Sequence, residues 1–347
     1  MGMLVAGRWT EEERNIERGA FVRQASVYGG ALAPGLIEAM AAEPGRFHLV
    51  ASLSCPWSHR TLIVHRLKGL AGAVPLQVAG GKRVQGYRLN DGRPWPIPGA
   101  NRQAVHVHEL YALGDPRYSG RASVPLLWDG ATQSIASNES AAIMRAFDAV
   151  KWPESGLDFT LVPESLRAKI DALNASLQKD LSNAVYRAGL AQKQEAYDVA
   201  VANVFAMLDA LEARLAARRH LFGATITESD WRLFPTLVRF DAVYHTHFRC
   251  TRRRLLDYPS LWGYARDLYA WPGMAALVDF DAIRAGYYLN DGDHNPHGIV
   301  AAAPDSDWKA PHGREALGPA QIALRSGGTR EVSPQEFREL QSSHCSH

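Results

Sequence analysis

The stretch FHLVASLSCPWSHRTLIVHRL, residues 47–67, decides the fold of the first half of the chain. Residues 47–52 form a short apolar run typical of a buried strand, and residues 57–67 place apolar side chains at helical spacing. Between them stands Cys55, followed by Pro56, and proline is favoured in the first turn of a helix because its missing N–H has no partner there anyway. We therefore expect Cys55 at or next to the cap of a helix that follows a strand.

The residues that follow complete an α/β unit. Glycine and proline are concentrated over residues 80–100, which predicts an irregular loop that forms one wall of a cleft. We expect a strand opened by a proline over residues 123–129, a second strand over 131–136 and a helix over 141–147. Strand, helix, two strands and helix in this order predict a thioredoxin-like domain over residues 45–150.

The second half of the chain is expected to be helical. Apolar residues recur at helical spacing over residues 165–217, and the pattern continues to residue 270. Thr227, with Asp230 three residues on, has the pattern of a capping box at a helix start. The predicted division is an N-terminal extension (1–44), the thioredoxin-like domain (45–150), an all-helical domain (165–300) and a C-terminal tail (301–347) that is either packed on the surface or partly disordered.

Composition and charge exclude several classes of protein. Of the 347 residues, 46% are hydrophobic and 21% are charged, which are globular values that leave room for two cores. Lys and Arg total 38 against 36 for Asp and Glu, so we expect no nucleic-acid or anionic-membrane partner. No apolar run reaches the roughly 18 residues of a membrane span, and the N-terminus lacks a signal-peptide pattern. The three distant cysteines, Cys55, Cys250 and Cys345, argue against a disulfide framework or zinc site and favour a reducing cytoplasm.

Only Cys55 has surroundings that favour a reactive thiol. A thiol at a helix N-terminus faces unpaired N–H groups and the positive end of the helix dipole, which stabilise the thiolate. His59 and Arg60 add to this if they point back toward the sulfur. Ser58 stands where a resolving cysteine would be, so a mixed disulfide on Cys55 has to wait for an external thiol. The alternative for a lone cysteine is a small buried core residue.

The segment SCPWSHRTL, residues 54–62, resembles the active-site motif of the Xi-class glutathione transferases, the glutathionyl-hydroquinone reductases. The likeness covers nearly the whole chain from about residue 18 to residue 300. Its further motifs are GAFVR (19–23), DPRYSGR (115–121), VPLLWD (124–129), NES (138–140), VYRAG (185–189), EAY (195–197), YPSLW (258–262), YY (287–288) and NPHGIV (295–300).

This resemblance implies a glutathione transferase fold, in which the thioredoxin-like domain binds glutathione as co-substrate and the all-helical domain binds an aromatic substrate, in a homodimer and without a metal. A cis Pro125 would present the Val124 backbone to the cysteinyl part of glutathione. Glu139 and Ser140, which by themselves are typical of a helix start, would bind the γ-glutamyl end. The other glutathione-binding candidates are Trp57 and Tyr87.

The reaction implied by the resemblance begins with attack of the Cys55 thiolate on the sulfur of a glutathionyl-hydroquinone. This step gives a mixed disulfide and releases hydroquinone, and a second glutathione then leaves as glutathione disulfide. Because a ring carbon is a poor leaving group, the ring needs a proton, which tyrosine hydroxyls can supply. The matching catalytic candidates are Tyr186 and one of Tyr287 and Tyr288. Without the resemblance, such tyrosines are more typical of a packed core.

Three positions depart from the pattern of these relatives. Tyr87 follows Gly86 where the relatives usually have a tryptophan whose ring packs over glutathione, and Trp95 is a candidate to compensate for it. Ser58 stands where alanine is commoner, and Gly286 precedes the tyrosine pair where histidine is common. None of these removes a reacting group, but the first leaves the substrate range open.

Two other functions fit the same residues. The first is a general omega-like thioltransferase or dehydroascorbate reductase, which shares the cysteine but not the aromatic substrate. The second is a non-catalytic interaction module with a glutathione transferase fold. A metal enzyme is not expected: His294 and His297, near Asp291 and Asp293, are metal-ligand types, but the surrounding Asn, Pro and Gly indicate a turn.

Overall fold

The computed structural model describes residues 2–11, 16–153, 157–292 and 294–342. The chain forms two compact units, each made of segments that are separate in sequence. The thioredoxin-like unit comprises Met1–Arg14, Gln24–Ser155 and Asp279–Ala301, and the helical unit comprises Asn15–Arg23, Gly156–Val278 and Ala302–His347.

A five-stranded sheet forms the centre of the thioredoxin-like unit, in the order β11-β10-β5-β6-β7. Strands β5 and β6 are parallel, and the other neighbours are antiparallel. The sheet strands are β5 (Phe47–Ala51), β6 (Leu76–Gly80), β7 (Arg88–Leu89), β10 (Leu126–Asp129) and β11 (Ser134–Ser137). The predicted strand over residues 47–52 is present as β5. The strand expected at 123–129 begins only at Leu126, after Pro125, and the one expected at 131–136 begins at Ser134 because residues 130–133 form the turn that leads into it.

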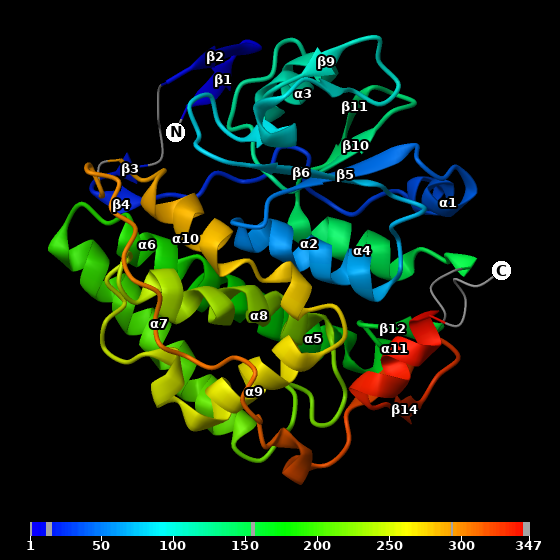
Figure 1. The fold of residues 1–347 in the computed structure, drawn as a ribbon, viewed down its shortest axis with the longest axis vertical. Helices are drawn as coiled ribbons and strands as arrows, with labels where there is room; N and C mark the ends of the chain where they lie inside the picture. The colour runs from blue at the N-terminus through cyan, green and yellow to red at the C-terminus, as the bar shows by residue number, and fades with distance from the viewer. Residues whose placement is uncertain (1, 12–15, 154–156, 293, 343–347) are drawn as a thin grey trace. The chain divides into compact units, whose positions relative to one another are not determined.

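Helices cover both faces of this sheet. Helix α2 packs against α4 on one face, and α3 lies on the other (Figure 1). The helices of the unit are α1 (Pro34–Ala42), α2 (Pro56–Leu67), α3 (Val107–Gly114), α4 (Ser140–Ala149) and α10 (Phe280–Tyr288). Two hairpins complete it: β1 (Met3–Val5) with β2 (Arg8–Thr10), and β8 (Trp95–Pro96) with β9 (Gln103–Ala104).

Six α-helices and two short sheets are described in the helical unit. The helices are α5 (Arg167–Ser176), α6 (Ala184–Gly189), α7 (Gln194–Leu215), α8 (Glu228–Arg239), α9 (Pro259–Ala270) and α11 (Pro334–Ser342). Helix α7 buries Val204, Leu208 and Leu211 at the spacing that predicted it. At the start of α8 the backbone N–H of Thr227 donates to the Asp230 carboxylate at 2.8 Å, which confirms the predicted capping box.

The described part of the C-terminal tail is folded. Strand β13 (Gln321–Leu324) pairs with β12 (Phe159–Thr160) and with β14 (Thr329–Glu331), and the hairpin β3 (Ile16–Glu17) with β4 (Ala20–Phe21) belongs to the same unit. On α11, the Phe337 ring contacts Phe159 and Trp271, with ring centroids 5.7 and 5.3 Å apart. The predicted division followed chain order. In the structure, α10 belongs to the thioredoxin-like unit, and the tail belongs to the helical unit.

Candidate functional site

Cys55 is the N-cap residue of α2. Its backbone is extended, with φ −85° and ψ 123°, and Pro56 occupies the first turn of the helix. The Cys55 carbonyl accepts the first helical hydrogen bond from His59 N at 3.0 Å. The placement predicted from the proline is therefore confirmed, and the thiol lies where the free N–H groups of the first turn are concentrated.

The carbonyl of Val124 lies against this thiol. Cys55 Sγ donates to Val124 O at 3.4 Å, and the Val124–Pro125 peptide bond is cis, as the resemblance implied. The segment before Val124 is fixed by buried tyrosines: Tyr111 Oη donates to Ser123 O at 2.9 Å. A backbone edge next to the sulfur is thus held in a defined position, as required for pairing with an extended peptide-like ligand.

Arg83, which sequence reasoning missed, supplies positive charge beside the thiol. Its guanidinium lies over the Tyr87 ring, 4.2 Å from the centroid. Burial lowers the pKa of Arg83, but the neighbouring Tyr87, Asp291, Cys55 and Tyr287 outweigh this effect and raise it. Because Cys55 is among the groups that act electrostatically on the Arg83 guanidinium, Arg83 is a candidate partner of the Cys55 sulfur. A lone arginine in a glycine- and proline-rich loop has no spacing pattern, so no signal in the sequence indicates that Arg83 is a candidate.

The two cations expected from the sequence are placed differently. Both His59 and Arg60 are buried within α2, and the Arg60 guanidinium lies over the Trp57 ring at 4.5 Å. Trp57 is therefore a packing partner of Arg60 in the first turns of α2. The Arg60 charge is directed at an indole face, where it gains a cation–π contact.

Tyr87 packs its ring against the guanidinium of Arg83. Burial, above all, raises the pKa of Tyr87 to about 12; Arg83 and Arg121 act in the opposite direction, while Cys55 raises it further through charge and hydrogen bonding. Tyr87 is therefore a protonated phenol at neutral pH. Trp95, the candidate to compensate for it, packs edge-on against His48 instead, with ring centroids 6.2 Å apart.

Helix α10 brings a tyrosine to the same region of the thioredoxin-like unit. A Cβ at Gly286 would overlap the Cβ of Ser54, the residue before Cys55, so only glycine permits this approach of α10 in the observed conformation. Arg83 anchors the same end, because its backbone N–H donates to Asn290 Oδ1 at 2.7 Å. The absence of a larger residue at position 286 is thus explained by the close approach of α10 to Ser54.

The two adjacent tyrosines of α10 have different neighbours. Both are buried, with 6% of Tyr287 and 5% of Tyr288 exposed. Tyr287 and Cys55 both act electrostatically on Arg83, whereas the charged neighbour of Tyr288 is Arg284. This shared electrostatic neighbour makes Tyr287 the favoured candidate of the pair.

Glu139 and Ser140 begin α4. The Glu139 carboxylate caps the helix by accepting from Ala141 N at 3.2 Å, and it also accepts from Ser26 Oγ at 3.0 Å. Ser140 occupies the first turn and is buried. The helix-start interpretation is therefore correct, and a ligand carboxylate placed here would meet the same free N–H groups. Ser26 belongs to the expected N-terminal extension and was missed, since only the folded chain brings it to Glu139.

Tyr186 lies in the helical unit, on α6. Its ring packs against Tyr244 and Phe248, with centroids 6.0 and 5.2 Å apart. The rings of Tyr244 and Phe248 are themselves stacked at 5.5 Å. Tyr186 is thus one member of an aromatic cluster, which holds its ring in a fixed orientation.

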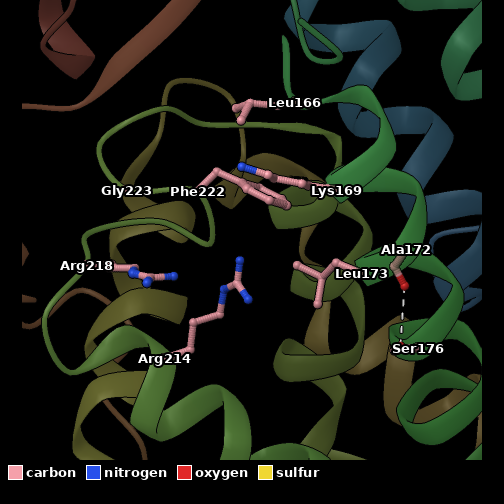
Figure 2. Close-up of a pocket in the computed structure, with 9 residues that line it drawn as sticks. All are labelled: Leu166, Lys169, Ala172, Leu173, Ser176, Arg214, Arg218, Phe222 and Gly223. Carbon is pink, nitrogen blue, oxygen red and sulfur yellow. Dashed lines mark hydrogen bonds between the residues drawn. The ribbon is translucent and has the colours of Figure 1, made fainter. Parts of the chain in front are cut away.

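A separate hollow of about 660 Å³ lies within the helical unit and contains none of the predicted site residues. Figure 2 shows the guanidinium of Arg214 extending into it, with Arg218 on one side. Arg214 lies over the Phe222 ring at 5.2 Å and donates through Nε to Leu221 O at 2.8 Å. The other lining residues are Leu166, Lys169, Ala172, Leu173, Ser176 and Gly223.

The remaining sequence candidates concern metals, cysteines and membranes. Across residues 2–11, 16–153, 157–292 and 294–342, no group of three His, Cys, Asp or Glu side chains is arranged to hold a metal ion. Within the same ranges, no helix has the length and apolar character needed to cross a bilayer. Cys55 and Cys250 carry free thiols, while Cys345 and Asp293 lie outside the described residues.

Comparison with known proteins agrees with this architecture. Residues 54–150 match the family model "Glutathione S-transferase, N-terminal domain", and residues 194–267 match "Glutathione S-transferase, C-terminal domain". The glutathionyl-hydroquinone reductase YqjG of Escherichia coli K12 is 41% identical over 324 residues, which cover 91% of this chain and 99% of YqjG. The chain belongs to the Xi-class glutathione transferases, the glutathionyl-hydroquinone reductase family.

Two further relatives support the same assignment. The glutathionyl-hydroquinone reductase PcpF of Sphingobium chlorophenolicum is 38% identical over 88% of this chain and 96% of its own. The structure of a Xi-class transferase from Natrialba magadii aligns with a TM-score of 0.80 at 39% identity, covering 91% of this chain and 97% of its own. The glutathione-bound structure of YqjG aligns with a TM-score of 0.72 at 43% identity, covering 79% of this chain and 89% of its own.

Proposed function

We propose that this Xi-class transferase is a glutathione-dependent reductase that removes glutathione from glutathionyl-hydroquinones. The observation that carries the proposal is Cys55 at the N-cap of α2, with its sulfur on the Val124 carbonyl and Arg83 beside it. The names of YqjG and PcpF supply the substrate class. The function combines a reactive thiol with a site for glutathione and needs no metal.

In the proposed first step, the Cys55 thiolate attacks the sulfur that joins glutathione to the ring. A Cys55–glutathione disulfide forms, the sulfur–carbon bond breaks, and hydroquinone leaves once its ring carbon is protonated. A second glutathione then attacks the mixed disulfide and leaves as glutathione disulfide. Ser58 stands three residues after Cys55 and cannot act as a resolving thiol, so this external thiol is required.

We assign the glutathione moiety to a site formed by the Val124 backbone and the start of α4. The Val124 backbone pairs with the cysteinyl part, and the first turn of α4, with Glu139 and Ser140, receives the γ-glutamyl end. Free N–H groups of that turn suit its carboxylate, and the Glu139 carboxylate suits its ammonium group. Trp57 supports the start of α2 from within, and Tyr87 flanks the sulfur.

We assign the ring hydroxyls to tyrosines. Tyr287 is the candidate that the geometry favours, because it shares Arg83 with Cys55. Tyr186 is assigned the same task from its motif, and its aromatic cluster keeps the phenol oriented within the helical unit. Neutral phenols can donate to ring oxygens and relay protons during carbon–sulfur cleavage.

The experiment is a turnover assay with glutathionyl-benzohydroquinone and free glutathione. We expect hydroquinone and glutathione disulfide in equal amounts, and no product from Cys55→Ser. A wild-type enzyme that exchanges small disulfides but releases no hydroquinone would contradict the proposal and favour a general thioltransferase. Failure in both assays with a folded protein would favour a non-catalytic interaction module.

We also propose that the protein works as a homodimer in a reducing cytoplasm. The free thiols of Cys55 and Cys250 support the compartment, since an oxidising one would put them at risk. The dimer follows from the family resemblance. Sedimentation velocity at micromolar concentration tests it, with a single species of twice the chain mass as the expected result and a monomer as the contrary one.

A further inference from the structure

The hollow of about 660 Å³ in the helical unit is lined by none of the residues assigned to the reaction. Its walls are α5, the end of α7 and the loop that follows α7, all of which belong to the helical unit. Sites that hold a small organic molecule have volumes of about 300–1,000 Å³, so the hollow is large enough for one. Its lining side chains indicate which kind of molecule it suits.

Three cationic side chains line this hollow. Lys169 lies in the first turn of α5, Arg214 lies in the last turn of α7, and Arg218 follows shortly after that helix. Figure 2 shows the three side chains directed toward the hollow, and none of its described lining residues is Asp or Glu. Positive charge is therefore concentrated here, although the formal net charge of the whole chain is only +2.

These cations have few partners within the protein. Among the described residues, the Lys169 ammonium and the Arg218 guanidinium form no hydrogen bond or ion pair. Arg214 lies over the Phe222 ring and donates through Nε to Leu221 O at 2.8 Å, while its Nη groups have no acceptor in the same part of the chain. An anionic group in the hollow would thus meet several unused donors.

Asp230 is the acidic neighbour of Arg214, but its carboxylate has other partners. It accepts from the backbone N–H of Leu221 at 2.9 Å and from Tyr264 Oη at 2.8 Å. Burial, followed by the like charge of Arg218, lowers the pKa of Arg214, and Asp230 and Tyr264 oppose this shift without reversing it. The charge of Arg214 is therefore not fully compensated, and a bound carboxylate would compensate it.

Helix dipoles explain only part of this arrangement. The C-terminal end of α7 carries the negative end of its dipole, which favours cations such as Arg214 and Arg218. Lys169 lies near the N-terminal end of α5, where the same effect disfavours a cation. The dipoles do not account for Lys169 beside the two arginines, whereas a shared anionic ligand does.

The hollow also presents apolar surface. Leu166, Leu173 and Phe222 line it and are only half-buried. A ligand body placed on them removes further apolar surface from water, which is favourable. An inorganic anion would use the cations but not this surface, so the lining suits a molecule that combines an acidic group with an apolar body.

We propose that this hollow is a binding site for a small organic acid. The apolar body of the acid, aromatic or alkyl, lies on Phe222 and the two leucines, and its carboxylate accepts a bidentate pair of hydrogen bonds from Arg214. Lys169 and Arg218 add positive charge around the carboxylate. The site shares no residue with the proposed reductase site and does not depend on that function.

Isothermal titration calorimetry of the full-length protein with 1-naphthoate at low salt tests the site. 1-Naphthalenemethanol keeps the ring without the charge, and inorganic phosphate keeps a charge without the ring, so each should bind at least about tenfold more weakly. Octanoate distinguishes the two kinds of body: tighter binding than naphthoate assigns an alkyl acid, and weaker binding assigns an aromatic one. Failure of both acids to bind, or equal binding of 1-naphthalenemethanol, would overturn the proposal.

Variants locate the bound acid. Arg214→Gln should weaken naphthoate binding about tenfold or more, and Arg214→Lys should recover only part of the loss because lysine lacks the planar fork. Lys169→Gln and Arg218→Gln alter exposed side chains, so the fold is retained, and each should weaken binding about threefold. The matched control is Arg252→Gln, because this arginine also lies over a ring, Phe205 at 5.1 Å, but does not line the hollow.

The same variants separate this site from the reductase. Lys169, Arg214 and Arg218 are assigned no part in the reaction, so turnover of a glutathionyl-hydroquinone should stay within about twofold of the wild type in each variant. If all three glutamine variants are folded and bind naphthoate as tightly as the wild type, the acid binds elsewhere and the proposal is wrong. Calorimetry needs no turnover, so failure of the reductase function and failure of this site are distinguishable.

Discussion

The part of the chain that the structure describes contains two buried thiols, Cys55 and Cys250, with different surroundings. Cys55 is 6% exposed and Cys250 is 0% exposed, so burial barely distinguishes them. Cys250 lies in the helical unit, where burial raises its pKa to about 12 and the partly opposing charge of Arg249 does not compensate. Its nearest polar partner is the Phe248 carbonyl at 3.9 Å, a long contact even for sulfur.

Cys55 differs in what converges on it. Helix α2 begins directly after the residue, the Val124 carbonyl ahead of β10 accepts a hydrogen bond from its thiol, and Arg83 is a charged neighbour of the sulfur. The difference supports the proposal that Cys55 is the nucleophile, because several segments surround its sulfur, whereas burial alone makes a thiol inert.

The largest expected effect separates the two thiols directly. Cys55→Ser should lower hydroquinone release by about a thousandfold or more, because an alcohol is not ionised at neutral pH. Cys250→Ala should keep the release rate within about twofold of the wild type once the folded fraction is matched by circular dichroism. If the two variants lose hydroquinone release equally, the different surroundings of Cys55 and Cys250 do not determine which thiol reacts.

The next effect tests which tyrosine of α10 belongs to the reactive side. Tyr287→Phe should lower kcat of the turnover reaction about 30-fold, because it removes a phenol near Arg83. Tyr288→Phe should change kcat by no more than about threefold, since its charged neighbour is Arg284. If kcat falls more in Tyr288→Phe than in Tyr287→Phe, the substrate ring binds beside Tyr288 and the assignment of Tyr287 is wrong.

A smaller effect concerns the close approach of α10 to Ser54. Gly286→Ala introduces a Cβ that overlaps the Ser54 side chain, so the helix must shift away from the thiol. We expect about tenfold slower hydroquinone release and a loss of about 1–3 kcal/mol in the free energy of unfolding. Gly292→Ala is the control, because a Cβ there meets open space. Normal activity of Gly286→Ala would mean that α10 does not position the site.

The smallest expected effect concerns Cys250 and the pH dependence of the free energy of unfolding. The pKa of Cys250 rises from 9.0 to about 12 on burial, so the folded protein keeps a proton that the unfolded chain loses. Its contribution to stability is complete below about pH 9 and is lost as the pH rises toward 12.

Cys250→Ala should therefore make the free energy of unfolding less steep between pH 9 and pH 10.5, by at most about 1.4 kcal/mol per pH unit. Urea melts at several pH values measure the slope, and Cys55→Ala serves as the second thiol deletion. Identical slopes in wild type and Cys250→Ala would contradict the burial of this thiol.

Local signals made much of the site predictable. A proline after Cys55 predicted the helix cap, and the Thr227 and Asp230 pair predicted another, because both depend on residues a few positions apart. The family motif predicted the cis bond before Pro125.

What could not be predicted depends on distant segments. Arg83 and Cys55 become electrostatic neighbours only in the folded chain, and α10 joins the thioredoxin-like unit after more than a hundred residues of the helical one. The tail likewise gains its structure from β12, far earlier in the chain. Composition identified these segments as loop and tail, but it carries no information about their partners.

The most direct measurement is peptide mapping after a single turnover. The protein is incubated with one equivalent of glutathionyl-benzohydroquinone without free thiol, quenched in acid, digested and analysed by mass spectrometry. The account predicts one adduct of about 305 Da on Cys55, none on Cys250 or Cys345, and one equivalent of free hydroquinone. An adduct on either other cysteine, or hydroquinone released without any adduct, would contradict it.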